Sequence, residues 1–261
     1  MSNHEEPLIL AIETATRAGN VALARGEEVL HSLSGDAVSS HSTDLLENVE
    51  ELLRCGETDL SRVDLFAAAS GPGSFTGLRI GLATIKSFAV CVGKKCVGVP
   101  TLAAIAHAAG ESGRTVALLP AGRGEVFAQL FSVSREQVSA LDSATHITPK
   151  ALLKKYGQMQ NIVWAGEGAH VQVENLRSWA ESKKVVFANR ESNDASIERE
   201  GWILAPRCEQ LAVSVAALAL HEYRGGNTIA PDELRAIYVR PSDAEINERW
   251  QHEKSQPSPR T

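Results

Sequence analysis

The sequence has few of the residues that mark disulfide-rich or metal-binding proteins. It holds 4 cysteines in 261 residues, and no two of them form a CxxC pair. Cys55, Cys91, Cys96 and Cys208 are scattered through apolar or helical contexts. This distribution predicts buried, reduced thiols rather than disulfides or a zinc site, and it favours a cytoplasmic protein.

The sequence also lacks a basic excess and long apolar runs. Its 26 Lys and Arg are outnumbered by 32 Asp and Glu, which gives a net charge of -6. Nucleic-acid binding depends mainly on Lys and Arg that neutralise phosphates, so we expect any RNA role to need a basic partner. Residues 1–7 are polar and acidic, and no apolar run reaches membrane-spanning length, so we expect neither secretion nor membrane insertion.

The apolar content of 43% is sufficient for a large core. Apolar runs bounded by turn residues predict strands, and apolar residues at helical spacing predict helices, in both halves of the chain. The predicted strands are 8–12, 21–24, 29–33, 64–70, 96–99, 115–119, 125–133, 162–165 and 236–239. The predicted helices are 41–55, 76–92, 100–109, 149–156, 171–180 and a last one from 206 to the glycine pair at 225–226.

This mixture predicts an α/β fold of two lobes. The predicted units are an N-terminal lobe at 7–106, a C-terminal lobe at 107–205, a helix that packs back on the lobes at 206–226 and a flexible tail at 241–261.

A glycine-rich turn, GPGSFTGLRIG at 71–81, joins a predicted strand to a predicted helix. Glycines let backbone N–H groups approach an anion at a helix N-terminus, so a phosphate loop is one interpretation. A Walker loop, however, requires Gly-Lys-Ser/Thr where this chain has Gly77-Leu78-Arg79, and a dinucleotide fingerprint requires a third glycine where it has Thr76. The spacing therefore favours close packing over phosphate binding.

The helix at 76–92 has two faces that need covering. One is an apolar stripe that includes Leu78, Leu82 and Ile85, and the other is a face of small groups that includes Gly77 and Gly81. Both faces can be buried within the chain, which is what most apolar helices achieve. Alternatively, this helix and the helix at 41–55 share an exposed surface of the kind that marks an interface.

Several segments carry a family resemblance. They are LILAIETATRAGNVAL at 8–23, HSTDLLENVEELL at 41–53, GPGSFTGLRIGLATIKSFA at 71–89, GVPTLAAIA at 98–106 and GRGEVFA at 122–128. In these segments the chain resembles the TsaB (YeaZ) family, strongly over the first half and weakly over the rest, apart from Tyr238-Val239-Arg240.

The resemblance implies a two-lobed, ribonuclease H-like fold related to the actin, sugar-kinase and Hsp70 ATPases. It also implies a function: TsaB-like proteins are non-catalytic paralogues of the TsaD-type transferase. With that enzyme and a TsaE-type ATPase, they take part in making threonylcarbamoyladenosine at position 37 of tRNAs that read codons beginning with A. The chain is then expected to pair with the TsaD-type subunit, to form a homodimer when alone, and to meet tRNA indirectly. No cofactor is expected on it, with ATP and Mg²⁺ at the level of the complex.

Two positions agree with a non-catalytic subunit. Catalytic TsaD-type members carry an HxxxH pair for metal coordination where this chain has Thr101 and Ile105. His107 lies nearby without a partner at helical spacing, which is typical of a packed or solvated side chain. His41 begins its helix and is interpreted as a capping or interface group rather than a base. We therefore predict no catalytic residue and no metal site.

The opening hairpin leaves an alternative open. Kinase-like relatives place an Asp at the end of the first strand to organise Mg²⁺ and phosphate, and here Glu13 takes that position before Thr14 and Thr16. These three are candidate vestigial nucleotide-binding residues, although the two hydroxyls would equally serve to pin the turn. The alternative function is a nucleotide-binding ATPase or a carbamoyl or phosphoryl transferase. A peptidase is disfavoured because the chain has no HExxH and no GxSxG motif.

The second lobe departs from the family pattern. Many relatives read D-A-R-x-G-E-V-Y, whereas this chain has Pro120 in place of the Asp and Gly122 in place of the Arg, with Arg123 at the next position. No site is therefore assigned in the second lobe.

The predicted partner interface lies on the helices at 41–55 and 76–92 and on the glycine turn. Burial of apolar side chains would supply the association energy, and Gly77 and Gly81 would allow close approach. The predicted interface residues are His41, Leu45, Leu46, Val49, Gly71, Pro72, Gly73, Ser74, Phe75, Thr76, Gly77, Leu78, Gly81, Leu82 and Ile85.

Overall fold

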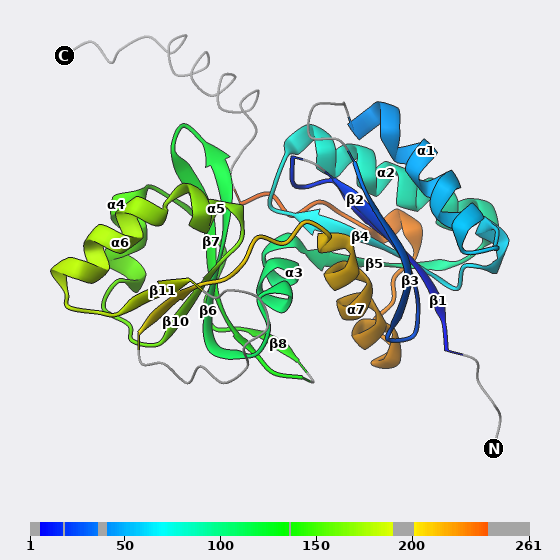
Figure 1. Cartoon of the computed structure of the whole chain (residues 1–261). Coiled ribbons are helices and arrows are strands. Elements are labelled where there is room, and N and C mark those ends of the chain that lie inside the picture. The colour runs from blue at the N-terminus through cyan, green and yellow to red at the C-terminus, as the bar shows by residue number, and fades with distance from the viewer. Residues whose placement is uncertain (1–5, 18, 36–40, 136, 190–200, 240–261) are drawn as a thin grey trace, which may run out of the picture.

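The computed structural model describes residues 6–17, 19–35, 41–135, 137–189 and 201–239, without the side chains of 41–43. Within these residues, two β-sheets form the centres of two lobes (Figure 1). The predicted tail at 241–261 and Arg240 lie outside the described residues.

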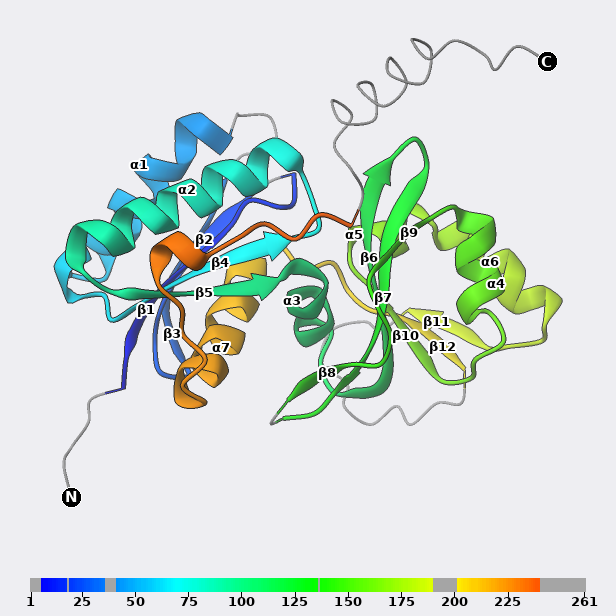
Figure 2. The ribbon, with the colours of Figure 1, turned by 180° about the vertical axis from the view of Figure 1, so that it is seen from behind.

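The first sheet has the strand order β3-β2-β1-β4-β5. Its strands are β1 (Leu8–Glu13), β2 (Asn20–Arg25), β3 (Glu28–Ser34), β4 (Leu65–Gly71) and β5 (Lys95–Pro100). The first three form the predicted antiparallel meander, and β4 and β5 run parallel to β1 on its other side. Two helices, α1 (His41–Cys55) and α2 (Phe75–Val92), lie side by side over this sheet (Figures 1 and 2), and a 3-10 turn, η1 (Leu60–Arg62), precedes β4.

The second sheet has the strand order β11-β12-β10-β6-β7-β8, with β9 also paired to β7. Its strands are β6 (Ser112–Gly122), β7 (Glu125–Val133), β8 (Val138–Ala140), β9 (Thr145–Ile147), β10 (Ile162–Ala165), β11 (Phe187–Asn189) and β12 (Trp202–Leu204). Three helices cover its outer face: α4 (Pro149–Tyr156), α5 (Glu167–Val171) and α6 (Val173–Ser182).

Five strands of the second sheet repeat the arrangement of the first. The order β8-β7-β6-β10-β12 matches β3-β2-β1-β4-β5, and in both sheets three antiparallel strands are followed by two parallel ones. This is the ribonuclease H-like arrangement, present twice. It confirms the predicted two-lobed α/β fold.

Helices α3 (Thr101–Ala108) and α7 (Leu211–Arg224) lie between the two sheets (Figure 1). Each packs on the sheet of the other half of the chain, because α3 contacts β6 and β7 whereas α7 contacts β1 and β2. Their shared core is rich in small side chains such as Ala104, Ala212 and Ala216, which lets the two helices and both sheets pack closely. The lobes are therefore joined by a continuous core rather than by a linker.

Some elements differ from the predictions. The helix predicted at 171–180 is α6, and the short α5 that precedes it was not predicted; the last helix begins at Leu211 rather than at 206. The segment at 236–239 follows a short turn, η2 (Pro231–Glu233), and forms no strand: it is held by a bond from the Ile237 N–H to the Ser70 carbonyl, at 2.7 Å.

The four cysteines are free, as predicted, but they are not all buried. Cys96 lies in the core, and burial raises the pKa of its thiol to about 11. Cys55 is half-buried, whereas Cys91 and Cys208 are exposed, so the prediction of buried thiols is wrong for these two.

Candidate functional site

The turn between β1 and β2 lies where the two lobes meet. Glu13 is fully buried, and its carboxylate accepts hydrogen bonds from the Thr16 N–H (2.7 Å), the Thr16 hydroxyl (2.5 Å) and the Asn20 amide (3.3 Å). The buried Thr14 hydroxyl donates to the carbonyl of Gly77 at 2.7 Å. The three candidate nucleotide-binding residues therefore hold the turn in shape and attach it to α2.

Asn20, which sequence reasoning missed, connects this turn to the last helix. Its Oδ1 accepts the N–H of Ala212 at 2.5 Å, across 192 residues of chain, and its Nδ2 donates to the carbonyl of Glu209 at 3.4 Å. No side chain next to α7 caps that helix, so Asn20 satisfies an N-terminal donor that would otherwise be unpaired. The one sign of this role in the sequence was that Asn20, a polar residue, stands at the start of a buried strand.

The glycines of α2 bring this helix onto the same turn. A Cβ at Gly77 or Gly81 would lie less than 3.0 Å from the Thr14 backbone or side chain, and a Cβ at Gly73 would lie equally close to Ala15. The Ser74 N–H donates to the Ala15 carbonyl at 2.8 Å. The turn is thus a close-packing element, but the backbone that approaches it belongs to the same chain.

Gly71 and Thr101 fix the other side of the glycine turn. Gly71 has a φ of 116°, and a Cβ there would collide with the carbonyl of Ile237. Its N–H donates to the Thr101 hydroxyl at 3.1 Å, and Ile105 is buried in the core between the lobes. The two positions of the family's HxxxH pair therefore carry a hydrogen-bond acceptor and a core side chain. Among the described residues, no group of three or more His, Cys, Asp or Glu side chains is arranged to hold a metal.

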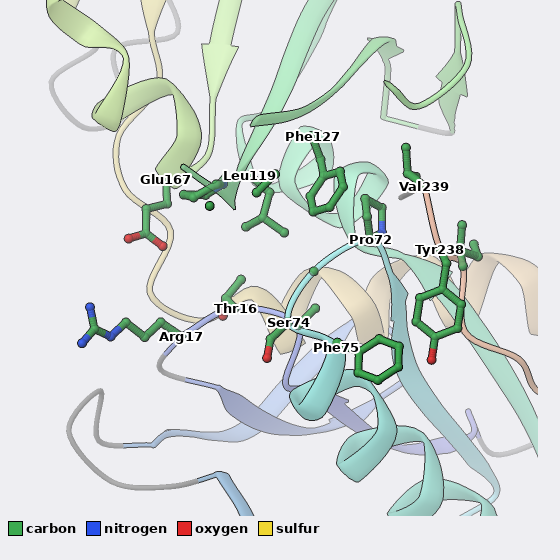
Figure 3. Close-up of a pocket in the computed structure, with 16 residues that line it drawn as sticks. Thr16, Arg17, Pro72, Ser74, Phe75, Leu119, Phe127, Glu167, Tyr238 and Val239 are labelled. Carbon is green, nitrogen blue, oxygen red and sulfur yellow. The ribbon is translucent and has the colours of Figure 1, made fainter. Parts of the chain in front are cut away.

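A cavity of about 550 Å³ opens between the lobes beside the glycine turn (Figure 3). Its walls include Thr16, Arg17 and Glu167 on one side and the rings of Phe75 and Tyr238 on the other. These two rings lie 5.2 Å apart. The cavity has polar groups near one end and an aromatic pair at the other.

The second-lobe wall of this cavity contains Pro120 and Gly122, the two positions that depart from the family pattern. Arg123 is exposed in a left-handed turn and is not part of the wall. Arg123 therefore does not take the place, inside the cavity, of the arginine that many relatives carry at the position of Gly122.

The predicted interface residues fall into two groups. Nine are buried within the chain, in the core, in the glycine turn or against the β1–β2 turn: Leu45, Val49, Gly71, Pro72, Gly77, Leu78, Gly81, Leu82 and Ile85. In this fold these groups pack within the chain and are not accessible, and their interface role stays a prediction. Leu46, Ser74 and Thr76 are exposed, and Gly73 and Phe75 are half-buried. The side chain of His41 lies outside the described residues.

Helix α2 has a third face, which the sequence analysis did not single out. Besides Cys91, five exposed residues recur along it every three or four positions: Thr76, Arg79, Ala83, Ser87 and Val90. Val90 is 67% exposed, and Leu46 on the neighbouring α1 is 57% exposed. We call these five residues and Leu46 the outward face.

Most of the outward face lies on α2, which is an unusually apolar helix for one that is partly exposed. By length and composition α2 is the one helix, within the described residues, that is apolar enough to cross a membrane; 33% of its residues are buried, and the others are half-buried or exposed. The exposed side of this helix has a mixed composition and is available for contact with a partner.

The fold and the site together define the class: a duplicated ribonuclease H-like protein whose inter-lobe turn is closed by its own side chains and which presents an uncovered helical face. The model of the TsaD family, described as tRNA N6-adenosine threonylcarbamoyltransferase, matches residues 35–230. The chain belongs to this family, in its TsaB (YeaZ) group.

Individual relatives agree with this assignment. The chain is 25% identical to the tRNA threonylcarbamoyladenosine biosynthesis protein TsaB of Escherichia coli (strain K12), over 89% of this chain and 94% of the relative. It is 27% identical to the protein of the same name from Haemophilus influenzae, over 89% and 93%. Among solved structures, YeaZ from Pseudomonas aeruginosa is similar with a TM-score of 0.68, at 23% identity, over 89% of this chain and 99% of that one.

Proposed function

We propose that this chain is a partner subunit in the biosynthesis of threonylcarbamoyladenosine in tRNA, and that it pairs through its outward face with a TsaD-type transferase. The observation that carries the proposal is the exposed side of α2 together with the exposed Leu46 on the neighbouring α1. Relatives named for this biosynthesis along almost their whole length support the pathway.

The chemistry of the outward face suits a helix of a related protein. Ala83 and Ser87 are small, so a partner helix can approach closely, while Leu46 and Val90 offer apolar area. Burial of such area contributes about 25 cal/mol per Å² before the entropic costs of association. The TsaD family model spans both α1 and α2 of this chain, so we expect a TsaD-type subunit to have equivalent helices. Like faces can then pair about a near-twofold axis, and a second copy of this chain pairs in the same way when no partner is present.

The catalytic step is assigned to the partner. In this chain Thr101 and Ile105 stand where the transferase carries its imidazole pair, and the carboxylate of Glu13 is engaged within its own turn. ATP and Mg²⁺ are accordingly assigned to the TsaD-type and TsaE-type subunits of the complex.

The test is sedimentation of the chain mixed with a TsaD-type subunit. Leu46→Asp is expected to abolish the mixed pair, because it places a charge in an apolar contact, while the unfolding midpoint stays unchanged. The matched control is Leu141→Asp, a leucine of the second lobe that is 51% exposed. Pairing that survives Leu46→Asp, or is lost equally with Leu141→Asp, would contradict the proposal.

A further inference from the structure

The duplicated fold places two helices of opposite charge in equivalent positions. Each of α1 and α4 follows the antiparallel strands of its lobe and precedes the first parallel strand. Helix α1 carries four carboxylates, Asp44, Glu47, Glu50 and Glu51, against Arg54, for a net charge of -3. Helix α4 carries three lysines and no carboxylate, for a net charge of +3. The outer helices of the two lobes therefore attract opposite kinds of surface.

The positive charge of α4 has a neighbour at the end of α6. Helix α6 itself carries Glu174 and Glu181 against Arg177, for a net charge of -1, and two lysines follow it. The two helices lie side by side at the outer end of the second lobe (Figures 1 and 2), and the Trp179 indole N–H of α6 donates to the Gly157 carbonyl at the end of α4, at 3.1 Å. Lys183 and Lys184 directly follow α6. With Lys150 and Lys154 they form what we call the basic face.

The lysines of the basic face are exposed and form no ion pair within the part of the chain that the structure describes. None of Lys150, Lys154, Lys183 and Lys184 forms a salt bridge among the described residues, whereas the adjacent Lys155 pairs with Asp142 at 2.8 Å. A lysine in the last turn of a helix complements the helix dipole, but Lys150 lies in the first turn of α4, where that dipole disfavours a cation. Helix stability does not account for its position.

Aromatic rings lie among these cations. The half-buried Trp179 has the Lys183 ammonium 5.4 Å from its ring centroid, and the half-buried Phe187 has the Arg177 guanidinium at 5.9 Å. Lysines that contact phosphates, together with aromatic rings, are the combination that RNA-binding surfaces use.

We infer that the basic face binds the phosphate backbone of folded RNA, which, if the proposed function holds, is the tRNA substrate. The acidic α1 of a second copy would also complement it. However, a contact between α1 of one copy and the basic face of another is head-to-tail, and it generates open-ended polymers rather than a closed complex. RNA is therefore the better occupant. The basic face lies at the opposite end of the molecule from α1 and α2 (Figure 1), so RNA and the transferase can be bound together. It supplies the local positive charge that the overall charge of -6 lacks.

The test measures binding of an unmodified tRNA transcript to the chain in its complex with a TsaD-type subunit, and to the chain alone. The variant Lys150→Gln/Lys154→Gln/Lys183→Gln is expected to weaken binding about tenfold or more. It should also reduce the slope of log affinity against log salt by about 2 to 3, since each lost phosphate contact removes ~0.9. The control Arg25→Gln/Arg62→Gln/Lys95→Gln changes the net charge equally with exposed cations of the first lobe, and it is expected to bind within about twofold of the wild type.

The inference would be overturned by unchanged RNA binding in the lysine variant, by an equal loss of RNA binding in the control, or by a variant that loses salt-sensitive self-association instead of RNA binding. Equal loss of binding to anionic lipid vesicles would likewise show that the surface does not select RNA. The proposed function is judged separately, by sedimentation with the TsaD-type subunit. A chain that never pairs contradicts that function, while the comparison of lysine and control variants on the chain alone still decides this inference.

Discussion

Replacing Gly77 by Ala asks what the glycine turn is for. The Cβ of an alanine at this position would collide with the backbone carbonyl of Thr14, which belongs to the same chain. If the glycines serve intramolecular packing, the isolated chain loses stability. If they serve the approach of a partner helix, the isolated chain keeps or gains stability and only pairing weakens.

The magnitude follows from three terms. Alanine in place of glycine inside a helix stabilises by about 1 kcal/mol. Forcing an extra methyl group into packed structure costs about 1 to 3 kcal/mol. The displacement also breaks the buried Thr14 to Gly77 hydrogen bond, now 2.7 Å, which costs about 1 to 3 kcal/mol when the donor is left unpaired. The expected net loss is about 3 kcal/mol in the free energy of unfolding. For a chain of this size that lowers Tm by roughly 6 to 12 °C.

Differential scanning calorimetry and urea unfolding of the isolated chain measure this loss. Gly113→Ala is the matched control, because a Cβ at Gly113 meets nothing within 4 Å. It should leave Tm within about 2 °C of the wild type, the shift expected from a neutral surface change. A Gly77→Ala chain as stable as the wild type would refute the assignment of the glycine turn to packing within the chain.

Three further predictions concern the inter-lobe turn and its surroundings. Asn20→Ala leaves the Ala212 N–H without its cap and is expected to lower the free energy of unfolding by about 1 to 2 kcal/mol, with the hydrogen-exchange protection of the first turn of α7 falling first. Glu13→Ala removes the acceptor of the Thr16 and Asn20 hydrogen bonds and should cost about 2 to 4 kcal/mol in urea unfolding; calorimetry with Mg²⁺-ATP should give the same heat for variant and wild type, and tight binding lost in the variant would favour the alternative ATPase function. Burial lowers the pKa of His107 below its usual 6.5, so the unfolded chain takes up a proton before the folded chain as the pH falls. The stability that neutral His107 contributes is complete above about pH 7 and is lost as the pH falls below 6.5. His107→Gln should therefore reduce the slope of the unfolding free energy against pH between about pH 7 and 5, and a variant with the wild-type slope would contradict this origin.

Much of the first lobe could be predicted because its signals are local. The meander of β1 to β3 is marked by apolar runs and turn residues, and α2 begins at Ser74, which caps it, and ends at the left-handed Gly93. The short strands β8, β9, β11 and β12 carry too few residues for a periodic pattern, and their existence depends on the long strands beside them.

The individual residues of the partner surface could not be predicted, because the periodic pattern of a helix does not show whether a given face packs against the same chain or against a partner. The glycine face of α2 was assigned to a partner, but Thr14 of the opening hairpin occupies it. What remains exposed is a face of mixed composition, Thr76 to Val90, whose pattern gives no apolar signal. The cap from Asn20 to α7 and the packing of α3 and α7 on opposite lobes are also decided by tertiary contacts between distant segments.

The most direct test of the proposed function measures threonylcarbamoyladenosine formed on tRNA in a reconstituted reaction with a TsaD-type transferase and its other components. Full product is expected with the wild-type chain and with Leu141→Asp, and product near background is expected without the chain or with Leu46→Asp. Full product in the absence of this chain, or with Leu46→Asp, would contradict the account.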